Sequence, residues 1–132
     1  MEEILIKAAM EAQRYAYSPY SEYCVGAALL TSEGKVFRGC NIENASFGAT
    51  NCAERTAVFK AISEGYHDFN AIAIVGGKNS KFSDYAYPCG ICRQVMQEFC
   101  DANFKVIVAR NTEDYKVYTL AELLPFGFEG DA

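Results

Sequence analysis

The chain begins with a helical pattern of apolar residues. Over residues 2–17 these residues recur at a spacing of three to four, which places them in one stripe along a helix. The stripe consists of Ile4, Leu5, Ala8, Ala9, Ala12 and Ala16. Pro19 lacks a backbone N–H and cannot continue a helix. The pattern therefore predicts an amphipathic helix over residues 2–17 that ends before this proline.

The next segments have the pattern of a β-hairpin. Residues 23–31 are rich in small and β-branched side chains, and residues 36–40 form a shorter run of the same kind. The turn-forming cluster Ser-Glu-Gly-Lys at residues 32–35 separates them. Residues 41–51 follow neither the helical nor the strand period. We expect them to form a loop over the sheet, a place where functional residues are common.

Two further helices are indicated by apolar spacing and by the residues at their ends. Residues 52–64 have helical spacing and precede Gly65, the usual type of residue beyond a helix C-terminus. Asn51 is the expected N-terminal cap of this helix. Another helix is expected to begin just after Pro88 and to run through Phe99.

The remaining segments complete an α/β pattern. Strands are expected at residues 71–75, 104–110 and 116–118, with a turn-rich connection over residues 76–88. Residues 119–122 form a capping box that opens a final short helix. The order of elements predicts an α/β protein, a three-layer α/β/α sandwich around a mixed sheet of about five strands.

Composition narrows the class of protein. A chain of 132 residues that is 51% hydrophobic can build one packed core, so we expect a single domain over residues 1–132. The 17 acidic and 12 basic residues give a net charge of −5, which does not attract a polyanion. We therefore expect a small or neutral substrate and no nucleic-acid partner. We also expect no signal peptide, no membrane partner, and a reduced, cytoplasmic protein.

Three of the six cysteines predict a metal centre. Cys52, Cys89 and Cys92 lie where predicted helices begin, and the partial positive charge of a helix N-terminus stabilises thiolates, the form that binds metal. Three thiolates leave the fourth tetrahedral position of zinc open for water, which is typical of a catalytic site. His67 is the only histidine and is expected in an exposed loop rather than as a ligand.

Charged residues beside these cysteines indicate the chemistry of the site. Glu54 is two residues from Cys52 and need not be a ligand to reach whatever binds the metal. Zinc lowers the pKa of its water to about 7, and a carboxylate in this place can carry protons between water and substrate. Arg55 and Arg93 adjoin the ligands, and their guanidinium groups are expected to offset the thiolate charge. The alternatives are a first-turn acid for Glu54 and solvated helix positions for the two arginines.

The motifs Cys52-Ala53-Glu54 and Pro88-Cys89-Gly90-Ile91-Cys92 resemble those of the zinc nucleoside deaminases. The similarity covers nearly the whole chain, because four other segments look like the small homotetrameric cytidine deaminases. These are residues 17–21, 25–29, 39–45 and 122–125.

The resemblance implies zinc-dependent hydrolytic deamination of cytidine and 2′-deoxycytidine to uridine and 2′-deoxyuridine, with release of ammonia, in pyrimidine salvage. It implies one Zn²⁺ per subunit, bound by Cys52, Cys89 and Cys92. Hydroxide on the zinc would attack carbon 4 of the pyrimidine, and Glu54 would shuttle protons to the ring nitrogen and the departing amine.

The resemblance also assigns the substrate contacts. Asn41 and Glu43 match the ribose-binding pair of the family, although ordinary loop capping is an alternative for both. The backbone of Ala53 matches a contact to the base, which Tyr23 flanks where the family commonly has Phe. Phe128 matches an aromatic residue that reaches the active site of a neighbouring subunit, which implies a homotetramer; the alternative is that it covers its own core.

Three other functions fit parts of the pattern. A deaminase of a modified nucleoside such as blasticidin S is disfavoured by the loop 41–44, which looks suited to an unmodified ribose. A nonenzymatic zinc domain is disfavoured by Glu54 and by the missing fourth ligand. A nucleic-acid-editing deaminase is disfavoured because the sequence has no Lys/Arg cluster. The other cysteines, expected to be small buried apolar residues rather than ligands, are Cys24, Cys40 and Cys100.

Overall fold

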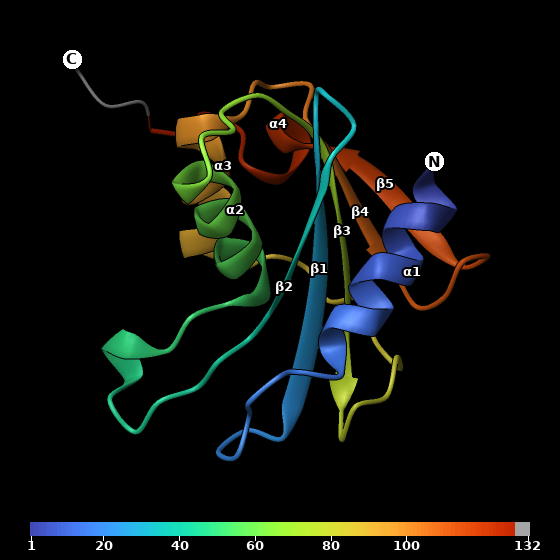
Figure 1. Cartoon of the computed structure of the whole chain (residues 1–132), viewed down its shortest axis with the longest axis vertical. Helices are drawn as coiled ribbons and strands as arrows, with labels where there is room; N and C mark the ends of the chain where they lie inside the picture. The colour runs from blue at the N-terminus through green and yellow to red at the C-terminus, as the bar shows by residue number, and fades with distance from the viewer. Residues whose placement is uncertain (129–132) are drawn as a thin grey trace.

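A computed structural model describes residues 1–128 of the chain, so the last four residues of the predicted domain, 129–132, lie outside the described part. The described elements share a five-stranded sheet with the order β2-β1-β3-β4-β5 (Figure 1). The strands are β1 Tyr23–Thr31, β2 Val36–Cys40, β3 Phe69–Lys78, β4 Lys105–Ala109 and β5 Tyr115–Thr119. Among the five strands of the described residues, only β3 and β4 pair in parallel with each other, which confirms the predicted mixed sheet.

Helices cover both faces of this sheet. On one face lies α1 (Glu2–Gln13), and on the other α2 (Ala53–Ser63) and α3 (Gly90–Phe99) lie side by side (Figure 1). The short α4 (Leu120–Leu123) follows β5 and packs against α3. Two apolar cores separate the layers, which confirms the predicted three-layer α/β/α sandwich.

The two cores follow from the alternation of side chains along the central strands. In β3, Ile72 and Ile74 point toward α2 and α3, whereas Ala73 and Val75 point toward α1. This strand is buried on both faces, and its continuous apolar run reflects that position. Within residues 1–128, no helix combines the length and the apolarity that crossing a membrane requires.

The first helix is shorter than its pattern predicted, because residues beyond Gln13 form tertiary contacts. The Gln13 side chain is buried, and its Nε2 donates to the carbonyls of Cys24 and Lys81 at 3.0 and 2.8 Å. The backbone of Tyr17 pairs with the 41–43 loop instead of continuing a helix, with its N–H donating to the carbonyl of Asn41. The predicted extension of the helix to residue 17 was therefore wrong.

Other boundaries show what local pattern can predict. The hairpin strands have the predicted bounds, and the capping box of α4 is present, with the Thr119 side chain accepting from the backbone N–H of Glu122. In contrast, the cap of α2 is Cys52, whereas Asn51 donates from Nδ2 to the Thr56 hydroxyl. The predicted cap at Asn51 was therefore wrong.

Gly39 allows α2 to lie directly on β2. A methyl group at this position would come within 2.4 Å of the Ala53 carbonyl oxygen and 2.6 Å of the Ala57 nitrogen. Both obstacles are backbone atoms, which a side-chain rearrangement cannot move away. This close approach holds the N-terminal turn of α2, with Cys52 and Glu54, at a fixed distance from the sheet.

Candidate active site

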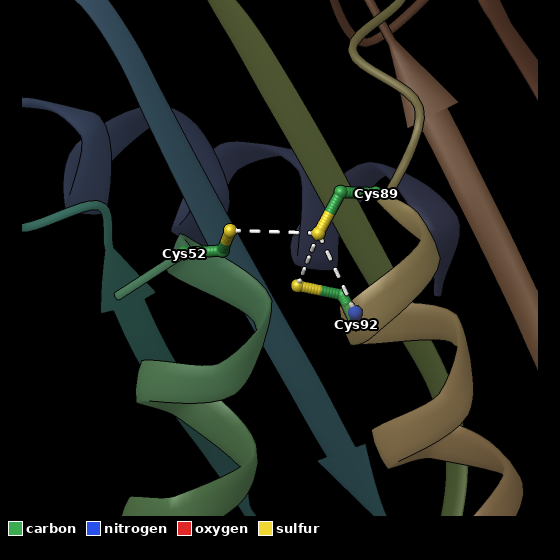
Figure 2. Close-up of side chains that lie close together, drawn as sticks. All are labelled: Cys52, Cys89 and Cys92. Carbon is green, nitrogen blue, oxygen red and sulfur yellow. Dashed lines mark hydrogen bonds between the residues drawn. The ribbon is translucent and has the colours of Figure 1, made fainter. Parts of the chain in front are cut away.

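The sulfur atoms of three cysteines converge between the N-termini of α2 and α3 (Figure 2). Cys52 is the cap of α2, Cys89 is the cap of α3, and Cys92 lies in the first turn of α3. The Sγ of Cys89 is 3.7 Å from that of Cys52 and 3.4 Å from that of Cys92. Around a zinc ion with bonds of ~2.3 Å, tetrahedral ligands are about 3.8 Å apart. The sulfur cluster therefore has the dimensions of a zinc site.

The pKa shifts of Cys52 and Cys92 indicate that the site is suited to a cation. Hydrogen bonding with Cys92 and then with Arg55 overcomes the effect of burial and lowers the pKa of Cys52 to about 5. The hydrogen bond to Cys52, together with burial, raises the pKa of Cys92. Cys52 therefore ionises easily, and its interaction with Cys92 favours the protonated form of Cys92. A dication with affinity for sulfur is the natural means of holding all three as thiolates.

Arg55 contributes positive charge to this cluster. Its Nη2 donates to Cys52 Sγ at 3.3 Å, as expected from its place beside the cysteine. Its Nε is buried without a hydrogen-bond partner in the described part of the chain. Three thiolates and one Zn²⁺ have a net charge of −1, which one guanidinium group offsets.

Arg93 has a different environment from the one expected. Its Nε donates to the carbonyl of Pro88 at 2.8 Å, and its Nη1 donates to the carbonyl of Leu123 at 2.7 Å. The residue after Cys92 lies about 100° further round α3, on the side that packs against α4. Arg93 therefore connects the backbone before Cys89 with the end of α4. Its two hydrogen bonds go to carbonyl groups rather than to thiolates.

Glu54 is a buried carboxyl group beside the cysteine cluster. It lies in the first turn of α2 with 5% of its surface exposed. Burial is the main reason that its pKa is raised to about 7, and the negative charge of Cys52 contributes in the same direction. A carboxyl group with a pKa near neutrality can both accept and donate a proton at physiological pH.

A cavity of about 340 Å³ opens beside Glu54 and the cysteines, within the usual size of small-molecule sites. It brings together most of the residues that the sequence singled out. These are Tyr23, Asn41, Glu43, Cys52, Ala53, Glu54 and Cys89. Sequence reasoning missed four other lining residues with hydroxyl groups, namely Ser21, Thr50, Tyr85 and Tyr87. Their positions in the sequence were the available signal, since Ser21 lies shortly before β1, Thr50 shortly before Cys52, and the two tyrosines shortly before Cys89.

Asn41 is held in place by the backbone of β1. Its Oδ1 accepts from the N–H of Val25 at 2.9 Å, and its Nδ2 donates to the carbonyl of Tyr23 at 2.8 Å. An amide oxygen has two lone pairs and an amide nitrogen has two N–H groups, so each atom retains capacity for a ligand. The loop-capping alternative is thus compatible with ligand binding.

Glu43 is held by the loop before β1. One oxygen accepts from the backbone N–H of Tyr20 at 2.9 Å, and the other accepts from the Ser21 hydroxyl. The Ser21 hydrogen bond is the largest cause of a lowered pKa for Glu43. Glu43 is therefore ionised at neutral pH and available as an acceptor beside the cavity.

Two predicted aromatic contacts differ in their placement. Tyr23 lines the cavity, and burial together with Asp84 raises its pKa to about 12, so its hydroxyl stays protonated. Phe128 is 72% exposed and is not among the residues that line the cavity of its own chain. Its carbonyl accepts from Gln94 Nε2 at 2.7 Å, which attaches the C-terminal segment to α3.

Within the described residues, the remaining cysteines lie outside the metal-binding cluster, and all six cysteines are free thiols. Cys24 is buried, and Cys40 and Cys100 are partly buried. His67 is exposed, as expected.

The fold and the site together define the class of protein. It is an α/β protein with a catalytic metal centre, because three sulfur atoms meet at two helix N-termini and a buried carboxyl group lies beside them in a cavity.

Comparison with known proteins identifies the family. Residues 1–109 match the cytidine and deoxycytidylate deaminase zinc-binding region. The chain is 51% identical over 129 residues to a cytidine deaminase of Halalkalibacterium halodurans, covering 98% of this chain and 95% of that protein. The chain therefore belongs to the cytidine and deoxycytidylate deaminase family, and zinc is its cofactor.

Two other comparisons bear on fold and specificity. The crystal structure of a cytidine deaminase from Burkholderia pseudomallei has a TM-score of 0.87 and 47% identity, covering 97% of this chain and 99% of that one. A blasticidin-S deaminase of Bacillus cereus is 31% identical over 112 residues, covering 82% of this chain and 79% of that protein. The modified-nucleoside deaminase is thus the more distant of these relatives.

Proposed function

We propose that this chain is a single-domain enzyme that hydrolyses cytidine and 2′-deoxycytidine to uridine and 2′-deoxyuridine, with release of ammonia, in pyrimidine salvage. The observation that carries this proposal is the buried Glu54 carboxyl group in a cavity that it shares with Cys52 and Cys89. The relatives named cytidine deaminase support the substrate. A cytoplasmic location is supported by the six free thiols, because a thiolate site requires reducing conditions.

The residues of the site have separate tasks in this reaction. Cys52, Cys89 and Cys92 hold the zinc, and Arg55 offsets their charge. Zinc, when bound, lowers the pKa of a water molecule to about 7 and so supplies the nucleophile for carbon 4 of the pyrimidine. Glu54 would accept the two protons of the attacking water in turn and would deliver one to the ring nitrogen and the other to the departing amine. The C–N bond breaks, a carbonyl group forms at carbon 4, and ammonia leaves.

Other residues of the cavity orient the nucleoside. Asn41 and Glu43 have spare hydrogen-bonding capacity and would bind the ribose hydroxyl groups. The backbone of Ala53 contacts the base, and Tyr23 packs against it. Because loop contacts fix Asn41 and Glu43 before substrate arrives, little conformational entropy is lost on binding.

The direct test of the proposed activity is a substrate panel. Purified protein with one bound zinc per chain is expected to convert cytidine and 2′-deoxycytidine, which is followed by the change in ultraviolet absorbance. Blasticidin S is expected to remain unchanged. The proposal would be contradicted if the zinc-loaded protein left both nucleosides intact, and conversion of blasticidin S alone would move the assignment to the modified-nucleoside deaminases.

The enzyme is proposed to work as a homotetramer in which Phe128 completes the cavity of a neighbouring subunit. Large apolar side chains are left in solvent by the single chain, with Phe47 83%, Phe126 104% and Phe128 72% exposed. Phe47 belongs to a second hollow that shares Ser21, Glu43 and Thr50 with the active-site cavity. Exposed apolar groups next to a binding site favour contact with another subunit.

Replacement of Phe128 by alanine tests this assembly. We expect KM for cytidine to rise about tenfold, because stacking of an aromatic ring on a base contributes ~1–3 kcal/mol. Phe128→Tyr keeps the ring and is expected to behave as wild type. Light scattering should give the mass of a tetramer for wild type and for both variants. A monomeric wild type, or an unchanged KM in Phe128→Ala, would show that Phe128 does not act in trans.

A further inference from the structure

One wall of the active-site cavity comes from a segment without regular secondary structure. Tyr85, Ala86 and Tyr87 line the cavity, and Ala86 is also buried in contact with β3. A methyl group at Gly76 would lie 2.8 Å from Cβ of Ala86, so the segment lies in direct contact with the strand. The hydroxyl groups of Tyr85 and Tyr87 both form hydrogen bonds with residues of the β4–β5 hairpin. These bonds therefore help to determine where this wall stands.

Tyr85 is attached to the turn between β4 and β5. Its hydroxyl donates to the Asp114 carboxylate, and the Lys116 ammonium and the Arg110 guanidinium lie 4.5 and 5.5 Å from the centre of its ring. Asp114 also pairs with Arg110 at 3.6 Å, and its N–H donates to Asn111 Oδ1 at 2.8 Å. The acceptor for Tyr85 is therefore itself held in position by the hairpin.

Tyr87 is attached to the same hairpin at a second point. Its hydroxyl shares a hydrogen bond of 2.8 Å with the hydroxyl of Tyr118 in β5. The two rings are 5.6 Å apart and tilted by 58°, an arrangement in which aromatic rings attract each other. Two residues after Tyr87 comes Cys89, the cap of α3. The hairpin thus holds both the cavity wall and the backbone that leads to the metal site.

We propose that the β4–β5 hairpin positions the substrate-binding wall of this enzyme through Asp114 and Tyr118. These two are positioning residues, because they act through Tyr85 and Tyr87 and do not line the cavity themselves. They lie beyond the region 1–109 that matches the family, so the match says nothing about them. The inference rests on the proposal that this cavity binds the nucleoside. It assigns to the hairpin a role in affinity for the substrate, separate from the bond-breaking step.

Replacement of Asp114 by alanine removes the acceptor for the Tyr85 hydroxyl. We expect KM for cytidine to rise about three- to tenfold, the effect of one net hydrogen bond, with kcat within about twofold of wild type. Asp114→Asn retains an acceptor oxygen and is expected to restore most of the affinity. Glu113→Ala, an exposed acid on the same turn, is the matched control and should leave KM unchanged. The measurement is steady-state deamination of cytidine, with zinc content determined for each variant.

Two further variants separate positioning from general damage. Tyr118→Phe removes a single hydroxyl group and should also raise KM, without the risk of unfolding that a larger change carries. The combination of Tyr85→Phe with Asp114→Ala should raise KM no more than either change alone, because both break the same hydrogen bond. Additive effects, or an unchanged KM in Asp114→Ala and Tyr118→Phe, would overturn the proposal.

Glu43→Gln, measured in parallel, distinguishes this inference from the assignment of the cavity. If Glu43→Gln raises KM while Asp114→Ala and Tyr118→Phe do not, the cavity binds the nucleoside and the hairpin does not position its wall. If none of these changes affects KM, the nucleoside binds elsewhere, and both the assignment of the cavity and the role of the hairpin are wrong.

Discussion

Glu54→Gln is expected to lower kcat for cytidine by between about 100- and 10,000-fold while leaving one zinc bound per chain. Glutamine has nearly the shape of glutamate, so it fills the same buried space in α2. It cannot accept and release a proton at neutral pH, which the carboxyl group does with a pKa of about 7. The rate of deamination and the metal content of the same sample, measured together, check this result.

The control for this change is an acidic residue at the other end of the same helix. Glu64 is exposed and pairs with Lys35 at 3.7 Å, an interaction that contributes little to stability. Glu64→Gln should therefore keep wild-type kinetics and zinc content. If Glu54→Gln lost its zinc, the carboxylate would be a ligand rather than a proton shuttle. If it kept most of its activity, another group would have to move the protons.

Cys89→Ala is expected to abolish both stoichiometric zinc binding and detectable deamination. Cys89 is central to the cluster, because its sulfur lies within 3.7 Å of Cys52 Sγ and 3.4 Å of Cys92 Sγ. It is also the exposed member, so its loss leaves no hole in the core. The change also removes the cap of α3, because Cys89 Sγ accepts from the backbone N–H of Cys92, so the contribution of the metal is the part of the stability that depends on added zinc. Bound ligand at about 100 times its Kd adds ~2.7 kcal/mol to the free energy of unfolding.

Thermal unfolding with and without added zinc provides the measurement. Metal-depleted wild type should show a higher Tm when zinc is added, whereas Cys89→Ala should show no such shift. Cys40→Ala is the matched control, because Cys40 is a free thiol outside the cluster, and it should behave as wild type. Retention of one zinc by Cys89→Ala would mean that other atoms complete the site and would weaken the assignment of three cysteine ligands.

Several features of the fold and site were predictable because they depend on neighbours in the sequence. The bounds of the β1–β2 hairpin follow from the turn cluster between two strand-like runs. The cap of α4 follows from Thr119 and Glu122, three residues apart, which bond each other's backbone groups. The spacing of Cys89 and Cys92 at the start of a helix suffices to bring both sulfur atoms together, because one helical turn separates them.

Features that depend on contacts between distant segments were not predictable in the same way. The end of α1 is decided by Gln13, which bonds to carbonyl groups on β1 and on the loop after β3. The extension of β3 to Lys78 depends on its pairing with β1, where Lys78 lies opposite Tyr23. Gly77 leaves room for the loop after β3, because a methyl group there would come within 2.3 Å of the Lys81 carbonyl oxygen. The direction of Arg93 depends on the carbonyl groups of Pro88 and Leu123.

The sequence by itself determined the layers, the cluster of three cysteines and the carboxyl group beside it, because periodicity, helix ends and short motifs are local properties. Only the tertiary structure decided which side chains enclose the cavity. Tyr85 and Tyr87 lie in a segment with no periodic pattern, and their partners Asp114 and Tyr118 are about thirty residues away. Such contacts form only after the sheet has brought the two segments together, so no short stretch of sequence specifies them.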